Sequence, residues 1–354
     1  MLSFLRHLGK RFLSILLTLF ITTALLYATV MLTPAETRAE LYMPKNFSPR
    51  MTEAQYQAML ERNIERYHLN APYPVQYFYW ITNLVQGSWG YSPTLQEDVL
   101  TAITRRAPAT VEVILFSILV YLPLGLISGV IAGSKQHKFS DRSFRTSAFI
   151  ATSLPPFILA ILMMAFFYID LHWFAPERIS SAYSIFIKSD EFRQVTGFLT
   201  IDGLLNGRPD ISLDALRHLA MPVITLAVAQ WAILGRITRA SLVEELHLDY
   251  VTAARARGVP ESRIVWTHMF RNVVSPAFSS SMISAASLLT GVFVVEIIFN
   301  YPGVSFIALR SMNNIPDAPA ALGFAIFSVF MVLLLMAILD LIQYGMDPRI
   351  REKA

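Results

Sequence analysis

The stretch that decides the class of this protein extends from Val111 to Ala132 and reads VEVILFSILVYLPLGLISGVIA. It holds a single charged side chain, Glu112. A helix needs roughly 20 mostly apolar residues to cross the ~30 Å hydrocarbon layer of a bilayer, and this stretch supplies them. It therefore predicts a transmembrane helix.

The composition extends this interpretation to the whole chain of 354 residues. Hydrophobic residues make up 54% and charged residues 15%, with a mean hydropathy of +0.48; soluble domains usually contain about 25% charged residues. The absence of cysteine excludes disulfides, thiolate metal sites and a cysteine nucleophile. A net charge of +4 gives no reason to expect a nucleic-acid partner. We expect an all-α polytopic protein embedded in a lipid bilayer.

Five further apolar stretches resemble the first. We expect six transmembrane helices, over residues 12–32, 109–133, 147–169, 219–237, 273–299 and 320–344. Thr33-Pro34-Ala35-Glu36 is a poor signal-peptidase site, so the first stretch is interpreted as a retained span. The other segments are then an N-terminus (1–11), a small external domain (33–108), a cytoplasmic loop (134–146), an external loop (170–218), a second cytoplasmic loop (238–272), an external loop (300–319) and a tail (345–354).

The basic residues predict which side of the membrane is cytoplasmic. They gather before the first span, in segment 134–146, in and just before segment 238–272, and after the sixth span. All four places share one side of the membrane in the six-span scheme. The segments on the other side are longer yet hold fewer Lys and Arg. The positive-inside rule then places both termini in the cytoplasm.

The two long external segments are rich in aromatic residues, so we expect ordered structure in both. In segment 33–108 we expect a helix over Thr52–Tyr67, followed by the aromatic stretch Tyr77-Phe78-Tyr79-Trp80. Segment 170–218 is less regular. The aromatic stretch fits either an interfacial belt, which is its commoner use, or a docking surface.

The sequence contains none of the common catalytic motifs. Gly9-Lys10 has no upstream glycine at P-loop spacing, and neither a His-Glu-x-x-His nor a Gly-x-Ser-x-Gly motif occurs. We therefore expect no catalytic residue, cofactor or metal site in this chain. Ion-coupled carriers usually keep charged groups deep in the bundle, whereas Glu112, Glu296 and Asp340 stand near the ends of spans. A self-sufficient secondary carrier or channel is thus the disfavoured alternative.

The loop over 238–272 has the pattern of two short capped helices. Asp249 is placed to cap a helix that begins at Tyr250, and Gly258 supplies a left-handed residue to end it. Pro260 and Glu261 then begin a second helix, with Pro at its first position. The first helix carries three alanines for a small surface and two arginines to complement its dipole, namely Ala253, Ala254, Ala256, Arg255 and Arg257.

Such a helix, short, small-faced and capped, suits a groove on another protein. The alternative is an interfacial helix that lies on the membrane surface, which would need a broad apolar face. Ala-Ala-Arg-Ala-Arg-Gly has no such face. Docking to a protein is therefore the favoured interpretation.

The same loop resembles the motif of a known family. Residues 249–258 read DYVTAARARG and are followed by His268, Arg271-Asn272 and Pro276. This is similar to the EAA coupling loop of ABC importer permeases, and more narrowly to its dipeptide/oligopeptide (peptide/nickel) version, D-Y-V-x-x-A-R-A-x-G followed by H-x-x-R-N-x-x-x-P. The general motif has Glu at Thr252 and an I-x-L-P ending at His268–Arg271. Both departures are usual in the peptide branch.

Shorter matches extend the resemblance over nearly the whole chain, and to the first-permease-subunit type with a long external segment after its first span. They are Tyr67-His68-Leu69, Pro74, Gln76-Tyr77, Trp80, Gly87–Ser92 (with Ser88 in place of the usual Asp), Arg106, Pro108-Ala109-Thr110, Glu112, His218–Pro222, Glu296, Phe299, Pro302-Gly303 and Asp347–Arg351.

The resemblance implies a type I ABC importer fold in a bacterial cytoplasmic (inner) membrane and a fixed set of partners. A second homologous permease subunit would complete the translocation pathway. Two ATP-binding subunits would bind ATP and Mg, and an external substrate-binding protein would deliver the cargo. The chain itself would be a transport subunit without an ATPase site. Cargo in this family includes di- and oligopeptides, nickel, glutathione and oligosaccharides.

The resemblance also implies that the first helix of the loop is the ATPase-coupling helix. Its residues would be Asp249, Tyr250, Thr252, Ala253, Ala254, Arg255, Ala256, Arg257 and Gly258. The two arginines would face either acids of the ATPase or lipid headgroups and water.

Three residues are candidates for the pathway or a gate. Pro155 and Pro156 fall inside the third span, where they would kink the helix and either form a hinge or merely shape the bundle. Glu296 stands near the external end of the fifth span. It would contact the substrate, or pair with a group such as Arg310 to fix the following turn. The structural role is favoured in both places.

Overall fold

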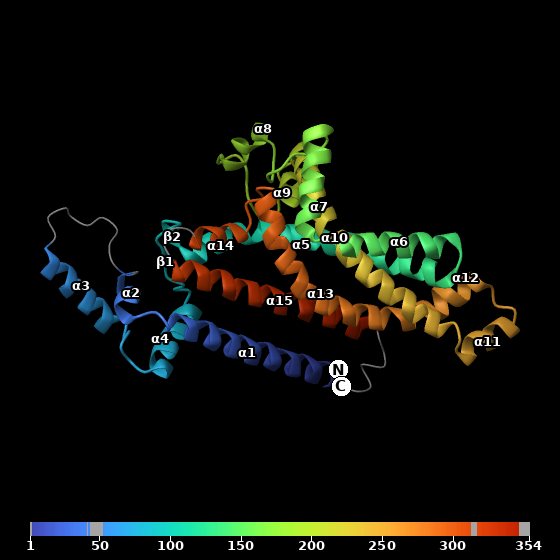
Figure 1. The fold of residues 1–354 in the computed structure, drawn as a ribbon, viewed down its shortest axis with the longest axis horizontal. Coiled ribbons are helices and arrows are strands. Elements are labelled where there is room, and N and C mark those ends of the chain that lie inside the picture. Colours follow the sequence, from blue (N-terminus) through green and yellow to red (C-terminus); the bar gives the residue numbers. More distant parts are fainter. Residues whose placement is uncertain (1, 41, 43–51, 313–316, 347–354) are drawn as a thin grey trace. The chain divides into compact units, whose positions relative to one another are not determined.

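The protein is almost wholly helical. The computed structural model describes residues 2–40, 42, 52–312 and 317–346, and Figure 1 shows their elements. Within these ranges the one sheet is an antiparallel pair of two-residue strands, β1 (Tyr91–Ser92) and β2 (Glu97–Asp98). The expected all-α fold class is confirmed. The chain divides into two compact units, one of Arg11–Arg106 and Phe306–Phe330, the other of Met1–Lys10, Ala107–Ser305 and Met331–Ala354.

The smaller unit contains most of the first long helix and the segment that follows it. Its helices, some of which continue into the other unit, are α1 (Leu2–Val30), α2 (Ala35–Glu40), α3 (Glu53–Arg66), α4 (Tyr73–Val85), the start of α5 (Val99–Ser134), α14 (Ser305–Ser311) and the start of α15 (Ala318–Met346). The helix expected over Thr52–Tyr67 is α3. Thr52 caps it and forms a capping box with Gln55.

Helix α4 divides the aromatic stretch between two faces. Tyr77 is buried, with its hydroxyl 2.9 Å from Thr23 Oγ1 of α1. Trp80 stacks on Tyr27 of α1, with ring centroids 4.9 Å apart. Phe78 and Tyr79 are 65% and 46% exposed. Half of the stretch therefore packs α4 on α1, and half stays available to a membrane interface or another molecule.

Arg38 of α2 connects the segment that follows α1 through hydrogen bonds. Its side chain is 7% exposed, and it donates from Nε to the Thr33 carbonyl (3.0 Å), from Nη1 to Gln76 Oε1 (2.7 Å) and from Nη2 to the Leu69 carbonyl (3.0 Å). Thr33 and Leu69 follow closely on the C-terminal ends of α1 and α3. A helix dipole is negative at its C-terminal end, so a cation is favoured there.

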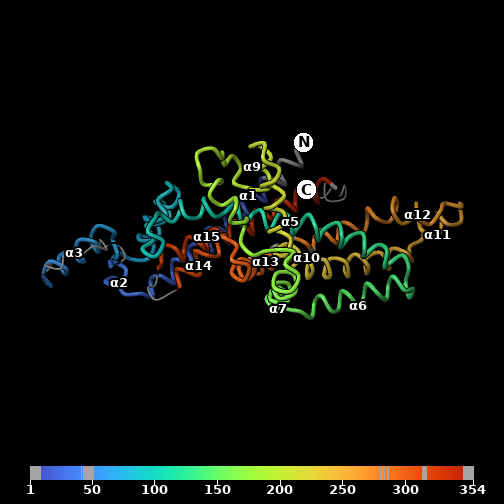
Figure 2. Tube along the Cα trace, turned by 90° about the horizontal axis from the view of Figure 1, so that it is seen from above, coloured from blue at the N-terminus to red at the C-terminus, as the bar shows by residue number. Residues whose placement is uncertain are grey.

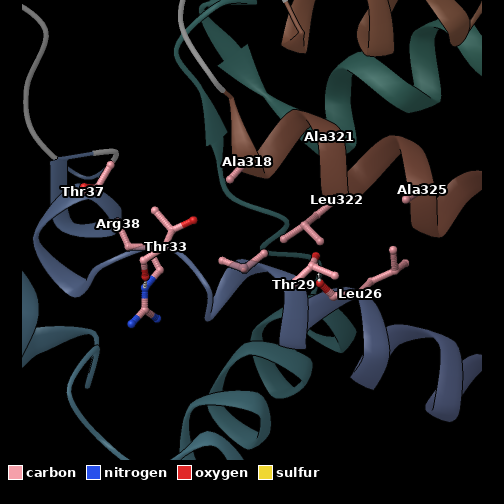
Figure 3. A pocket seen from close by; sticks show the side chains of 10 residues that line it. Leu26, Thr29, Thr33, Thr37, Arg38, Ala318, Ala321, Leu322 and Ala325 are labelled. Carbon is pink, nitrogen blue, oxygen red and sulfur yellow. Dashed lines mark hydrogen bonds between the residues drawn. The ribbon is translucent and has the colours of Figure 1, made fainter.

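Beside Arg38, α1 and the start of α15 enclose a groove of about 320 Å³. Leu26 and Thr29 of α1 stand across it from Ala321 and Leu322 of α15, and Arg38 lies at one end (Figure 3). Apart from threonine hydroxyls and Arg38 its walls are apolar, as expected of a surface that faces lipid or another helix.

The larger unit is a bundle built around α5, α10 (Pro209–Glu245) and α13 (Phe270–Ile298), with the end of α15. Its remaining elements before α10 are α6 (Phe139–Ser153), α7 (Pro156–Met163), the π-helical η1 (Met164–Asp170), α8 (Ser181–Ser184), the 3₁₀ turn η2 (Phe186–Lys188) and α9 (Leu199–Leu205). Helices α10 and α13 pack along each other in the middle of this unit (Figure 2). The core contains Tyr121, Leu219, Val292, Phe299 and Leu339.

Three glycines allow α5 to approach α10 closely. Gly125, Gly129 and Gly133 stand four residues apart on α5, and we call them the glycine seam. A Cβ on Gly129 would lie 2.6 Å from the carbonyl oxygen of Gly235, and one on Gly125 would lie 2.8 Å from the side chain of Leu234. Small residues at this spacing let two membrane helices bring their backbones together.

The stretch expected as the third span is broken. Helix α6 ends at Ser153, α7 begins at Pro156, and the two are bent by 98° at the break. Leu154 has an extended backbone (φ −94°, ψ 113°), as expected of a residue that precedes proline. The kink expected at Pro155-Pro156 is thus a full break, and the stretch is not one straight helix.

Four of the described helices are long and apolar enough to cross a bilayer: α1, α5, α10 and α15. The pair formed by α6 and α7–η1 makes a fifth if a bent pair counts as one span. The apolar part of α13, Ser287–Ile298, is shorter than a span needs. The chain is therefore multi-pass, and the number of six spans stays a prediction. The C-terminal motif Asp347–Arg351 lies outside the described residues.

The glycine seam generates a prediction in which steric contact and helix propensity oppose each other. Alanine is a better helix former than glycine by ~1 kcal/mol, so Gly9→Ala in α1, where a Cβ meets no atom within 4 Å, should be neutral or stabilising. Gly129→Ala should instead lower the stability by about 1–3 kcal/mol, because the added methyl meets backbone. Thermal unfolding of the two purified variants in one detergent measures this. Equal midpoints would contradict the close approach.

Candidate functional site

The loop between α10 and α13 folds as three short helices. They are α11 (Asp249–Ala256), α12 (Glu261–Arg263) and the π-helical η3 (Ile264–Met269). Helices α11 and α12 lie at one end of the larger unit, beyond the C-terminal end of α10 (Figure 1). The two short helices expected from the sequence are α11 and α12, and η3 follows as a third.

The expected capping of α11 by Asp249 is wrong. Leu248 holds the N-cap position with an extended backbone (φ −80°, ψ 148°), and no side chain caps the helix. Its carbonyl accepts from the amides of Val251 (3.0 Å) and Thr252 (3.4 Å), so the helix begins one residue earlier than expected. Asp249 is the first helical residue, and its negative charge in the first turn still complements the helix dipole.

Gly258 ends α11 as expected. Its φ is +76°, its amide donates to the Arg255 carbonyl (2.9 Å), and the amide of Val259 donates to the Ala254 carbonyl (3.1 Å). This pair of bonds is the Schellman pattern, which satisfies carbonyls left free at a helix end. Pro260 precedes α12 as its N-cap and is not its first residue, one position away from the expectation.

One face of α11 is anchored in an apolar cluster, which we call the loop cluster. Val251 is fully buried in it, and Ala254 and Val259 pack at its edge. The other members come from α5, α10, η3 and α13, and are Val130, Leu242, Ile264, Val265, Met269 and Val273. Because packed side chains transmit displacement, α11 cannot shift without moving these helices.

Three polar side chains, which we call the polar latch, attach α11 a second time. The Tyr250 hydroxyl donates to Glu245 Oε2 at the end of α10. Asn272 Nδ2 of α13 donates to the same carboxylate oxygen (3.1 Å) and to the Tyr250 hydroxyl (3.3 Å). Tyr250 and Asn272 belong to the motif found in the sequence, but the motif gave them no contact. Glu245 was missed, and the acidic pair Glu244-Glu245 shortly before the motif was the available signal.

The opposite face of α11 is small and open. Thr252, Ala253 and Ala256 are exposed, and a Cβ on Gly258 would meet no atom within 4 Å. Ala254, which we grouped with the docking alanines from the sequence alone, is half-buried and points toward the loop cluster. The surface available for close approach by another protein is therefore formed by Thr252, Ala253, Ala256 and Gly258.

The two arginines of α11 differ in their surroundings. Arg255 Nε donates to Glu261 Oε1 of α12 (2.6 Å), and this hydrogen bond lowers the pKa of the Glu261 carboxyl below its ordinary value. Arg257 is exposed and has no partner among the described residues. Arg257 is thus the one that another molecule can engage without breaking an existing ion pair.

Glu296, the acidic candidate for the pathway, is buried at the end of α13. Its carboxylate accepts from Thr110 Oγ1 of α5 (2.6 Å) and from the amide of Ser305 (3.0 Å). Gly303 leaves room for it, since a Cβ there would lie 2.0 Å from the carboxylate. The suggested partner Arg310 places its guanidinium 5.3 Å from the centroid of an aromatic ring. The observed contacts support a structural role for Glu296 in fixing the turn after α13.

Glu112 of α5 is the second buried acid. It is 0% exposed, accepts from the amide (3.0 Å) and hydroxyl (2.6 Å) of Thr200, and forms a salt bridge with Arg178 Nη2 (2.8 Å). These bonds tie α5 to the insert between η1 and α10. Removing one partner of a buried ion pair costs about 3–5 kcal/mol, so this pair has the character of an architectural tie.

A serine, an aspartate and a histidine also meet in this insert, without forming a catalytic triad. The Ser180 hydroxyl donates to Asp214 Oδ1 (2.7 Å) and lies 3.2 Å from His218 Nε2. His218 Nδ1 lies 2.9 Å from the Pro176 carbonyl. A triad requires the aspartate on Nδ1 and a serine that donates to Nε2, so this arrangement provides no activated nucleophile.

The whole chain is similar to known proteins. A model of the family described as "Binding-protein-dependent transport system inner membrane component" matches residues 100–352. The chain belongs to this family. It is an ABC importer permease, a multi-pass protein of the inner membrane. The matched residues include the glycine seam, the loop cluster and the polar latch.

Individual relatives cover the external segment as well. The permease is 31% identical to the Di/tripeptide transport system permease protein DppB of Pseudomonas aeruginosa, over 100% of both chains. It is 27% identical to the Dipeptide transport system permease protein DppB of Bacillus subtilis, over 98% of each. It is 28% identical to the Dipeptide transport system permease protein DppB of Escherichia coli, over 80% of this chain and 83% of that protein.

The polar latch predicts how firmly α11 is held. Tyr250→Phe combined with Asn272→Ala removes every hydrogen bond of the latch and leaves the loop cluster intact. Amide hydrogen exchange over residues 249–257 should then become at least about tenfold faster, because the three lost hydrogen bonds are worth ~1 kcal/mol each at most where they are partly exposed. Tyr91→Phe, at an exposed tyrosine in β1, is the matched control. Unchanged exchange in the double variant would mean that the loop cluster alone fixes α11.

Proposed function

We propose that this permease forms half of the translocation pathway of an ATP-driven importer for di- and oligopeptides, and that α11 couples it to an ATP-binding subunit. In this proposal a second homologous permease completes the pathway. Two partner subunits bind ATP and Mg, and an external binding protein delivers the peptide. This chain then contributes movement and a pathway, and no chemistry of its own.

The observation that carries the proposal is the two-faced character of α11. One face is anchored by the loop cluster and the polar latch, and the other exposes Thr252, Ala253, Ala256 and Gly258. Small side chains allow a partner's surface to approach the helix backbone, while the anchors keep the helix from moving alone. A helix that lies on a membrane would instead expose its apolar face, and here the apolar face is turned inward.

The anchors define the direction in which movement would pass. Closure of the ATPase pair on binding ATP would displace α11 as a rigid body. The loop cluster would pass this displacement to α5, α10 and α13, which contribute Val130, Leu242 and Val273 to it. The polar latch would add a direct connection to the ends of α10 and α13. Rotation of these helices would open the pathway on the opposite side.

The side of the membrane follows from charge. The basic residues flanking α11, together with those before α1 and between α5 and α6, support a cytoplasmic location for α11 and both termini by the positive-inside rule. The ATP-binding subunits would then lie in the cytoplasm. The segment that contains α2, α3 and α4 would face the binding protein, and it offers Phe78 and Tyr79 as exposed aromatic contacts.

Peptide cargo is supported by the names of the three relatives above, which are all dipeptide or di/tripeptide permeases. Nickel, glutathione and oligosaccharides are the alternatives within this transporter class.

Pro155, Pro156 and Glu296 are assigned to shaping the bundle. In this assignment a Glu296→Gln transporter keeps its range of substrates.

The coupling role is tested by a bulky residue on the exposed face of α11. Ala256→Trp should leave membrane insertion and the permease fold intact, because the position contacts neither the loop cluster nor the polar latch. Uptake and substrate-stimulated ATP hydrolysis in proteoliposomes that contain the full complex should fall at least about tenfold, because the indole prevents close approach of the ATPase. Lys135→Trp, on the exposed connection between α5 and α6, is the matched control.

Ala254→Trp and Gly258→Trp are less suitable variants. Ala254 packs at the loop cluster, and Gly258 has a φ of +76°, so either change would also disturb α11 itself. Normal coupled uptake in Ala256→Trp would remove the coupling assignment. Uptake by this chain alone, in vesicles that contain no ATP and no ATPase subunit, would instead establish the alternative of a self-sufficient secondary carrier or channel.

A further inference from the structure

A second pocket lies in the larger unit, far along the chain from α11. It has a volume of about 530 Å³ and is bounded by the end of η1, the insert that follows it and the start of α10. Its main lining residues are Tyr168, His172, Phe174, Ser180, Arg217 and His218. No acidic residue is among the described residues that line it. The coupling role of α11 makes no use of this pocket.

Arg217 gives the pocket a fixed positive charge. Its Nε donates to the Trp173 carbonyl (2.5 Å), and its Nη2 lies 3.4 Å from the His172 carbonyl. Both partners are neutral, so the guanidinium is held in place while its charge has no acidic counterpart among the described residues. Nη1 has no partner there either. A guanidinium with free N–H groups matches the geometry of phosphate and carboxylate oxygens.

The two histidines add directed nitrogens. His172 Nδ1 lies 2.9 Å from the Tyr168 carbonyl, which only accepts, so Nδ1 donates to it and Nε2 is left for a ligand. Nε2 donates to an anion when the ring is an imidazolium, with a proton on both nitrogens. His218 is already bonded on both sides, to the Pro176 carbonyl and to Ser180. Asp214, one turn before His218 on α10, is bonded to Ser180 and lies 3.6 Å from His218 Nε2. Arg217 and His172 are thus the groups free to hold an anion.

The surroundings of the pocket indicate where the anion comes from. The apolar helix α7–η1 ends at Asp170, and Tyr168 and Ile169 of its last turn line the pocket. Phe166, Ile169 and Trp173 next to it are 54%, 61% and 56% exposed. Exposed Trp and Tyr at the end of a membrane helix are typical of the headgroup level. The apolar surface beside the pocket would contact the acyl chains of a lipid. A small soluble anion would make no contact with this surface.

We propose that this pocket binds the phosphate of an anionic phospholipid, with Arg217 as its principal ligand and His172 as the second. The apolar side chains at the end of η1 hold the first part of the acyl chains. A lipid bound at this place would secure the broken third apolar segment and the insert to the membrane surface. The proposal rests on the membrane location of the permease and does not depend on its cargo or on α11.

The test is lipid retention by the intact transporter. The full complex is reconstituted in nanodiscs of phosphatidylcholine that contain some phosphatidylglycerol. The phosphatidylglycerol that stays bound to the complex is then measured by native mass spectrometry. Arg217→Gln should lower the apparent affinity for phosphatidylglycerol about tenfold or more, because it removes a charge-assisted bond. Arg217→Lys should have an affinity for phosphatidylglycerol between those of Arg217→Gln and the unmodified permease, since it keeps the charge and loses the planar fork. His172→Gln should give a smaller loss than Arg217→Gln.

Arg193→Gln is the matched control, because Arg193 is exposed in the same insert and does not line the pocket. Its retention of phosphatidylglycerol should equal that of the unmodified permease. Equal retention by Arg217→Gln and the unmodified permease would overturn the proposal. So would a raised KM for peptide uptake in Arg217→Gln with unchanged lipid retention, because the pocket would then serve a peptide carboxylate.

Discussion

The close approach of α5 and α10 along the glycine seam is the constraint on which the rest of the larger unit depends. Within a bilayer, apolar side chains gain little by leaving lipid for each other, so helices are held by tight packing and by hydrogen bonds. Gly125, Gly129 and Gly133 allow α5 to lie against the backbone and side chains of α10. A larger side chain at Gly129 would meet a carbonyl oxygen, which cannot rotate away.

Buried polar ties fix the other segments to these two helices. Glu112 and Thr110 of α5 bind the insert and the turn after α13, and Asp141 of α6 accepts two hydrogen bonds from Arg239 of α10 (2.5 and 3.0 Å). Each tie joins positions far apart along the chain. In surroundings of low dielectric an unpaired polar group is costly, so each tie restricts its segments to one arrangement. The bend at α6 and the insert before α10 are therefore fixed to the long helices by these bonds.

The same two helices provide the base for α11. The loop cluster is built on Val130 of α5 and Leu242 of α10, next to the last glycine of the seam, since a Cβ on Gly133 would lie 3.0 Å from Leu242. The polar latch begins at Glu245, the final residue of α10. A helix of eight residues is too short to be stable by itself. The C-terminal cap at Gly258 and these two attachments fix α11 to the ends of α10 and α13.

The sequence by itself determined the helical membrane class, the presence of α3 and α11, the left-handed end of α11 at Gly258, and the family. These features depend on local rules: the length of an apolar run, caps within a few residues, and a motif of fixed spacing. The sequence also contains the seam glycines at a spacing of four, but nothing in it indicates that they pack on α10.

Only the tertiary structure decided which side of α11 is free. Ala253, Ala254 and Ala256 are equivalent in the sequence, but in the structure Ala254 alone of the three packs against the loop cluster. It likewise decided that Pro155-Pro156 breaks the segment by 98°, and that Glu112 and Glu296 are bonded to Arg178 and Thr110. These outcomes depend on contacts between residues up to 186 positions apart. Local sequence patterns do not predict such contacts, since any of several distant groups could form hydrogen bonds with the same buried carboxylate.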